Sequence, residues 1–134
     1  MRLSSKTHYG LMLCDVLGKN YQAGEAVSAS TLESKIKVSG KYIEKILRIL
    51  SSRNIVGAKK GASGGYYLVR APKDITIGEI VRALEDDMEI IECVKGDAKC
   101  KCCSTSGVWK KLYDGINSVL DSMNLEQMIK GEIR

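Results

Sequence analysis

The fold of this chain is decided by residues 39–70, which read SGKYIEKILRILSSRNIVGAKKGASGGYYLVR. In the first half, apolar residues recur at steps of one and three, as on one face of a helix; they are Tyr42, Ile43, Ile46, Leu47 and Leu50. The second half holds two runs typical of β-strands, 54–60 and 66–70, separated by the glycine-rich turn 61–65. The stretch therefore predicts an amphipathic helix followed by a β-hairpin.

Two further helices are predicted before this stretch. Apolar residues at three- and four-residue steps indicate a helix that is capped near Ser4 and ended by Gly18 and Asn20. A shorter helix is expected over residues 27–36, followed by a break at 37–40. Helix, short helix, break, helix and hairpin is the element order of a winged helix-turn-helix.

The residues after the hairpin predict three more helices and a loop. Residues 76–79 have capping-box spacing and open a helix that runs through Leu84. A polar, cysteine-bearing loop spans 92–106, a helix of about four turns follows over 108–123, and a short last helix begins at Asn124. We therefore expect a mainly α fold with a small β-hairpin, in which a winged helix-turn-helix is joined to one long helix.

Composition and charge limit the class of protein. With 134 residues and 44% apolar residues, the chain suits one globular domain. No apolar run approaches the roughly 18–20 residues of a membrane span, and residues 1–6 lack the apolar stretch of a signal peptide, so we expect a cytoplasmic protein. Residues 1–73 contain 13 Lys and Arg against 4 Asp and Glu, whereas 74–134 contain 8 against 12. This asymmetry favours a polyanion partner for the first half, with ordinary solvated charge as the alternative.

The cations gather on two predicted elements. Lys41, Lys45 and Arg48 follow one another at steps of four and three, away from the apolar face of their helix. Lys59 and Lys60 come directly before the glycine turn, where the backbone can approach a phosphate closely. A helix of this size fits the major groove, and a basic hairpin can follow the DNA backbone or minor groove. Double-stranded DNA is the expected partner, and a protein-binding module is the alternative.

The cysteines indicate a second kind of site. Four of the five crowd together as Cys93, Cys100, Cys102 and Cys103, which in a reducing compartment points to metal or redox chemistry. Thiolates are soft ligands that suit iron–sulfur clusters, zinc or copper(I). Cys14 lies in an apolar helix and is expected to be an inert core residue. The sequence has no phosphate loop and no histidine with an evident carboxylate partner, so we do not expect an enzyme.

The chain resembles the family of winged-helix transcription regulators typified by IscR, NsrR and CymR. The likeness is carried by MRLSSK (1–6) with YGL (9–11), SGKYIEK (39–45), KGASGGY (60–66) and ITIGEIVRALE (75–85). It covers essentially the whole chain and implies a homodimer built around the helix holding residues 109–123; packing of that helix wholly inside its own subunit is the alternative. The implied layout is a DNA-binding region, residues 1–73, and a sensor loop with dimerisation helices, residues 74–134, within one compact domain.

The resemblance also implies which residues meet DNA. Positions matching Ser39, Lys41, Tyr42, Glu44 and Lys45 face the major groove in that family, and Lys60 reaches DNA from the tip of the wing. Tyr42 could equally be a core residue of its helix. Arg48 and Lys59 complete the candidate set through the charge pattern described above.

A sensor in the cysteine loop is implied as well. Iron–sulfur members of the family carry three cysteines before the dimer helix, and Cys103 keeps the familiar spacing to Trp109. The spacing of the three is compressed here, so either Cys100 or Cys102 could be the middle ligand. We favour Cys100, because Cys102 and Cys103 point in different directions if the chain is extended.

His8 is the candidate fourth ligand. Ser106 stands where some relatives place a histidine ligand, whereas others use the position of His8, donated across the dimer. We expect Cys93, Cys100, Cys103 and His8 to hold an iron–sulfur cluster, with [2Fe–2S] favoured. The expected function is a dimeric DNA-binding repressor or activator whose operator binding is controlled by that cluster. The alternatives are a solvated or DNA-facing His8, zinc in the same site, a metal-free thiol switch, and control by a protein partner.

Overall fold

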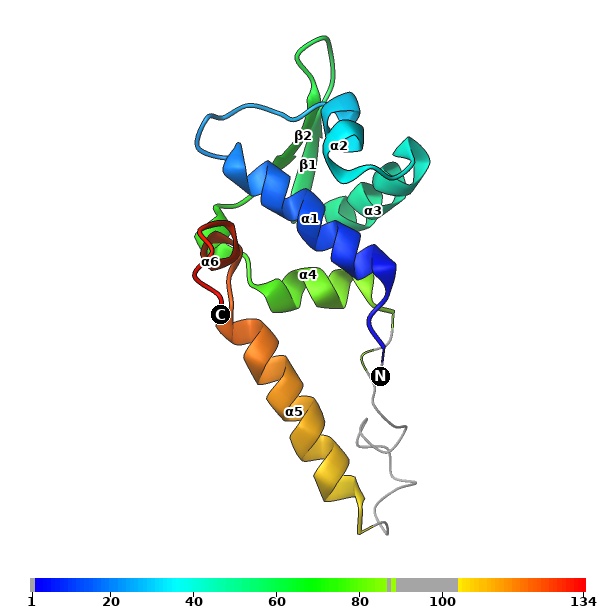
Figure 1. Ribbon diagram of the computed structural model, residues 1–134, viewed down its shortest axis with the longest axis vertical. Helices are drawn as coiled ribbons and strands as arrows, with labels where there is room; N and C mark the ends of the chain where they lie inside the picture. Colours follow the sequence, from blue (N-terminus) through cyan, green and yellow to red (C-terminus); the bar gives the residue numbers. More distant parts are fainter. Residues whose placement is uncertain (1, 87, 89–103) are drawn as a thin grey trace.

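The computed structural model describes residues 2–86, 88 and 104–134. Within them the elements follow in the order α1 (Ser5–Lys19), α2 (Ala29–Ile36), α3 (Gly40–Ser52), β1 (Val56–Lys59), β2 (Gly65–Leu68), the 3-10 helix η1 (Pro72–Asp74), α4 (Ile77–Leu84), α5 (Ser106–Ser122) and α6 (Leu125–Ile129). Figure 1 shows α1, α2, α3 and the hairpin gathered on one side, α4 passing beneath α1, and α5 extending away from the rest. The expectation of a mainly helical winged helix-turn-helix with one long helix is confirmed.

Side-chain caps define where the helices begin. The first four α-helices each start after a hydroxyl that accepts a hydrogen bond from the backbone N–H three residues later; these residues are Ser4, Ser28, Ser39 and Thr76. At α4 and α6, Glu79 and Gln127 return the bond to the cap residue and complete capping boxes. The predicted helix starts follow from this local chemistry.

The predicted end of α1 at Gly18 and Asn20 is confirmed at Asn20 and is early at Gly18. The helix continues through Gly18 to Lys19 and is capped at Asn20. Gly18 serves packing between helices instead, because a Cβ atom at this position would lie 2.2 Å from Cδ1 of Ile129 in α6. A glycine needed for close packing gives the same sequence signal as a glycine that ends a helix.

The hairpin is shorter than its two apolar runs. Its antiparallel register pairs Val56 with Leu68 and Lys59 with Gly65. The hairpin is also tied to the start of α2, because Val27 and Tyr66 exchange two backbone hydrogen bonds of 2.8 Å. This close approach requires glycine at position 65, where a Cβ atom would lie 2.2 Å from the Val27 carbonyl oxygen. The wing and the helix-turn-helix are therefore fixed to each other through backbone.

The main core lies between α1, α3, the hairpin and α4. Leu13, Ile46, Leu47 and Ile80 are completely buried in it. A second, smaller cluster joins α4 to one side of α5. No described residue of α5 itself is buried, so this helix is covered on one side only. Among the described residues, no helix is both long enough and apolar enough to cross a membrane.

Candidate nucleic-acid interface and its supports

The second helix of the helix-turn-helix, α3, separates its apolar and polar residues cleanly. Ile43, Ile46, Leu47 and Leu50 are buried, and the opposite face is exposed. That face carries the candidate residues Lys41, Glu44, Lys45 and Arg48. The apolar face orients the helix against the core, and this orientation leaves three cations in solvent on one surface.

The start of α3 is placed by two local features. Lys37, which follows α2, has a left-handed conformation with φ of 59°, and this reverses the chain direction between the two helices. Ser39 is exposed and caps α3 by accepting a hydrogen bond of 3.3 Å from the Tyr42 N–H. A hydroxyl that accepts such a bond still has a proton to donate.

A shallow depression brings several candidates together with the wing. It lies between α2, the start of α3 and β2, and it is lined by Ala29, Glu33, Ser39, Gly40, Lys41, Ile43, Glu44 and Tyr66. Lys59 and Lys60 are exposed at the end of β1 and the start of the hairpin turn. In Figure 1 this turn projects beyond α2 and α3. The structure thus places α3 and the hairpin turn, with Lys59 and Lys60 beside the turn, at the same end of the molecule.

Glu44 has a partner on its own helix. Arg48 Nη2 lies 3.3 Å from Glu44 Oε1, and both side chains are mostly exposed. Such an i,i+4 pair contributes only about 0.3–0.5 kcal/mol, so either residue can exchange its partner for DNA at small cost.

Tyr42 is partly buried rather than fully exposed or fully in the core. Its ring packs edge-on against Tyr9 of α1, with ring centroids 5.9 Å apart. Tyr9 in turn lies beside His8, at a centroid distance of 5.5 Å. Two candidate residues, His8 and Tyr42, are therefore in contact with the same intermediate ring.

The candidate metal ligands are described only in part. Cys93, Cys100 and Cys103, and the alternative Cys102, lie outside the described residues. His8 is exposed on the first turn of α1. Within residues 2–86, 88 and 104–134, no three His, Cys, Asp or Glu side chains are grouped as a metal site.

Cys14 lies in the core, as expected. It is completely buried, and burial, with the nearby Asp15 carboxylate, raises the pKa of its thiol to about 12. Because the thiolate is the reactive form, Cys14 is inert in the folded protein.

Glu85 holds the beginning of α1 to the end of α4, a role that no sequence pattern indicated. Its Oε1 accepts hydrogen bonds from the Ser4 N–H at 2.7 Å, from the Ser4 hydroxyl at 3.0 Å and from the Thr7 hydroxyl. Burial opposes ionisation of Glu85, but these bonds and the nearby Lys6 outweigh it and keep the pKa of Glu85 below its ordinary value. Ser4 and Glu85 are 81 positions apart, beyond the reach of any local pattern.

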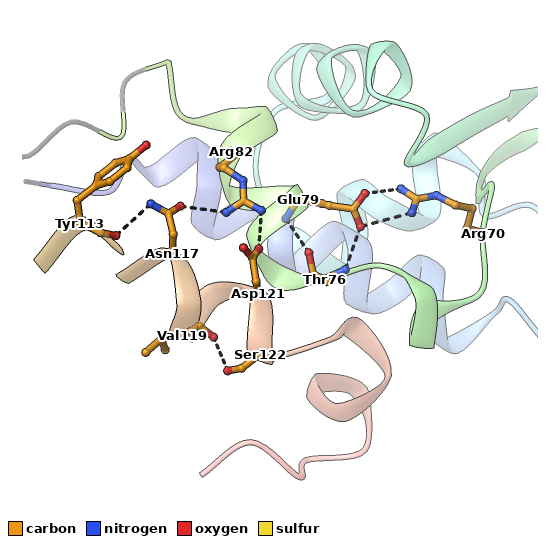
Figure 2. A network of polar contacts seen from close by, with 9 residues as sticks. All are labelled: Arg70, Thr76, Glu79, Arg82, Tyr113, Asn117, Val119, Asp121 and Ser122. Carbon is orange, nitrogen blue, oxygen red and sulfur yellow. Dashed lines mark hydrogen bonds and ion pairs between the residues drawn. The ribbon is translucent and has the colours of Figure 1, made fainter. Parts of the chain in front are cut away.

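Two arginines connect α4 to its other neighbours (Figure 2). Arg70, just after β2, contacts Glu79 at 2.9 Å, and Glu79 also closes the capping box of α4. Arg82 reaches from α4 to Asn117 and Asp121 of α5. Helix α4 is thus joined by charged side chains to the end of the wing, to α5 and to the start of α1.

The outer side of α5 presents an apolar strip. Val108, Leu112 and Val119 are 61%, 47% and 59% exposed. Together with neighbouring residues they line a shallow groove along the helix; the lining residues are Val108, Lys111, Leu112, Gly115, Ile116, Val119 and Leu120. Their recurrence at steps of three and four is the pattern of a helix that packs on another helix.

The Glu85 contacts make stability depend on pH. The pKa of Glu85 is lower in the folded protein than in the unfolded chain, so the ionised side chain stabilises the folded state. This contribution to stability is complete above the ordinary glutamate pKa of 4.5 and is lost as pH falls through the lower, folded-state pKa. We expect Glu85→Gln to cost about 1 kcal/mol of stability at pH 7 and to reduce the loss of stability between pH 5 and 3. Urea unfolding followed by circular dichroism measures both effects. Thr7→Val, which removes one donor, should act in the same direction. An unchanged pH dependence in Glu85→Gln would contradict this role.

Comparison with known proteins places this arrangement in a wider group. Residues 3–131 match the family described as Rrf2, iron-dependent transcriptional regulator. The HTH-type transcriptional regulator CymR of Bacillus subtilis is 30% identical over 128 residues, which cover 96% of this chain and 89% of CymR.

Solved structures agree with the sequence matches. The structure of CymR (YrzC), the global cysteine regulator of B. subtilis, has a TM-score of 0.79 at 29% identity and covers 97% of both chains. The structure of T. potens IscR also has a TM-score of 0.79, at 30% identity, and covers 99% of this chain and 89% of that one.

Proposed function

The chain belongs to the Rrf2 family of transcriptional regulators, and from this premise we propose that it is a homodimer whose operator affinity is controlled by an iron–sulfur cluster. It is a DNA-binding transcriptional regulator and not an enzyme. The observation that carries the finer proposal is the position of the cysteine-bearing segment in the chain. It joins α4, which is tied to α1 by Glu85, to the outward-facing helix α5. Residues 1–73 would then bind DNA, and residues 74–134 would sense and dimerise.

DNA recognition is supported by the exposed face of α3 and by the wing. Lys41, Lys45 and Lys60 are exposed and can neutralise phosphates, whose contacts position a protein on the duplex. Glu44 is an acceptor on the same face of α3 and can read a base edge, most directly the N4 amino group of cytosine. The division of roles follows from this chemistry: the lysines supply affinity, and Glu44 supplies sequence preference.

Replacement of Lys60 and replacement of Glu44 should therefore change DNA binding in different ways: the first should lower affinity, and the second should alter base preference. Lys60→Ala should weaken binding to every duplex several-fold and lower the slope of log K against log salt by about 1. Glu44→Ala should change base preference and release Arg48, with little loss on unrelated DNA. Fluorescence anisotropy with the selected operator and a scrambled duplex, at several salt concentrations, measures this; Lys130→Ala, just after α6, is the control. Equal losses on all sequences for both variants would reject the assignment.

Dimerisation is supported by the exposed apolar strip of α5. A helix of 17 residues with no buried residue leaves Val108, Leu112 and Val119 in water. Burying a large apolar side chain contributes about 1.5–3 kcal/mol, so pairing two such strips is strongly favourable. In a two-fold interface both subunits contribute the same surface, so the apolar strip of α5 would pack against its own copy in the partner.

Leu112→Asp or Ile116→Asp should break the dimer, because each places a charge in the apolar strip. Sedimentation velocity at micromolar concentration should show a dimer for the parent protein and a monomer for these variants. Ser118→Asp adds the same charge to the same helix outside the groove, and it should remain dimeric. A parent protein that sediments as a monomer under these conditions would contradict the proposal.

Cluster binding is supported by the chemistry of the available donors. Cys93, Cys100 and Cys103 offer soft thiolates, and His8 offers an imidazole that is exposed on its own subunit, so a partner subunit can reach it. When bound, an iron–sulfur cluster would supply a redox- and ligand-sensitive group at this position. His8 lies one residue from Thr7, which binds Glu85, and next to Tyr9, which packs on Tyr42. A change in the position of His8, caused by its binding to or release from a cluster, would therefore reach α3, the proposed recognition helix, through direct contacts. Such a change would shift the population of binding-competent dimers.

Control without an iron–sulfur cluster is the second candidate, because the similar B. subtilis protein CymR is a global cysteine regulator. In that case the signal would come from a protein partner, from zinc in the same ligands or from oxidation of the thiols. Anaerobic purification followed by an absorption spectrum and by iron, sulfide and zinc analysis separates these possibilities in one step.

The ligand set predicts the cluster content of single variants after anaerobic reconstitution. Cys14→Ala should keep the cluster because that thiol is buried, and Cys93→Ala or Cys103→Ala should lose it. His8→Ala should change the absorption spectrum or the rate of cluster loss. If His8→Ala matches the parent while Cys102→Ala loses the cluster, all four ligands are cysteines. The proposal that His8 binds the cluster across the dimer is then wrong.

A further inference from the structure

The angle of α5 against the rest of its subunit is set by backbone bonds at its C-terminal end, by the small apolar cluster that it shares with α4, and by polar side chains. At its C-terminal end the backbone is fixed by two hydrogen bonds: the Ile77 N–H donates to the Met123 carbonyl at 2.8 Å, and the Leu125 N–H donates to the Ile75 carbonyl at 2.9 Å. These bonds hold one end of the helix at a point. The direction in which α5 leaves that point depends on side chains.

Arg82 supplies a second point of attachment. Its guanidinium donates to Oδ1 of Asn117 at 3.0 Å and also to Oδ1 of Asp121 (Figure 2). Asn117 is itself held by a bond of 3.1 Å from its amide to the Tyr113 carbonyl. Because residues 117 and 121 are one turn apart on the same face, a planar group that binds both restricts the tilt and rotation of α5.

The backbone of α4 is shaped to admit this contact. A Cβ atom at Gly78 would lie 2.1 Å from Oδ1 of Asp121 and 2.8 Å from Nη2 of Arg82. The side chains of Arg82 and Asp121 are 36% and 48% exposed, and pairs this exposed add little to stability. The forked geometry of Arg82 therefore matters more for direction than for holding the fold together.

We infer that Arg82 is a positioning residue for operator recognition, because its two bonds to α5, added to the apolar cluster, restrict the angle between α5 and α4 and so the distance between the two recognition helices of the dimer. This inference rests on the proposed DNA-binding homodimer and is independent of the cluster. From Ser106 to Asn117, α5 extends about 16 Å beyond the Arg82 contact. A tilt of about 10° would move the far end by about 3 Å, close to the rise of one base pair of about 3.4 Å. Arg82 thereby selects the spacing of the two half-sites.

The test compares half-site spacing in the full-length protein. Half-sites selected with the parent are placed at separations varied one base pair at a time, and affinities are measured for the parent, Arg82→Met and Arg70→Met. Arg70→Met is a matched control, since Arg70 is as exposed as Arg82 and its carboxylate partner, Glu79, lies on α4, but the pair does not reach α5. We expect Arg82→Met to lose about tenfold in affinity at the preferred spacing and to accept neighbouring spacings, with single half-site binding unchanged. Arg70→Met should keep the narrow preference.

Two further variants weaken the Arg82 contact from the side of α5. Asp121→Asn and Asn117→Ser each weaken one arm of the fork, and should broaden the preference less; they replace Arg82→Met if sedimentation shows that it no longer dimerises. An unchanged, narrow preference in Arg82→Met, or equal broadening in Arg70→Met, would overturn the inference. A parent that binds one half-site but has no preferred spacing would overturn the dimeric proposal and this inference with it. A cluster-free parent that keeps its preferred spacing would remove only the proposed cluster control.

Discussion

The close approach of α1 and α4 is the constraint on which the rest of the structure depends. A Cβ atom at Gly10 would lie 2.1 Å from Cδ1 of Leu84, so glycine at this position lets the two helices touch. Glu85 then follows directly and binds the cap of α1. Within α1, Tyr9 packs against Tyr42 of α3. A displacement at the end of α4 cannot be absorbed locally, because packed side chains and charged hydrogen bonds connect it to α3.

Affinity and geometry come from different parts of the chain. The cations of α3 and the wing are exposed, so in the proposed complex they would attract phosphates without a fixed shape. Shape comes from α4, whose flanking contacts with Arg70, Glu85 and α5 orient the elements around it. This separation explains how a protein can keep a general affinity for DNA while its competence for one operator is adjusted elsewhere in the molecule.

Most of the fold could be predicted from sequence because its signals are local. Hydroxyl caps, apolar periodicity in α3 and the glycine turn of the wing each act within a few residues, and the elements formed as expected. The packing role of Gly18 could not be predicted because its partner, Ile129, is distant in sequence. Charge spacing indicated the exposed face of α3, whereas Glu85 and Arg82 were missed because their partners are 35–81 positions away. The cysteine ligands stay a prediction from the sequence and its resemblance alone.

The burial of Cys14 gives the molecule an internal reporter of global unfolding. Its thiol lies at the centre of α1 among residues of the main core, and its high pKa removes the reactive thiolate while the core is closed. An alkylating reagent can therefore reach it only when the core opens as a whole, in the same way that the slowest amide protons exchange. The rate of labelling at Cys14, read by mass spectrometry, would measure the opening free energy of the core without a cysteine having to be introduced. Comparing that rate with and without operator would show how far DNA binding closes the protein.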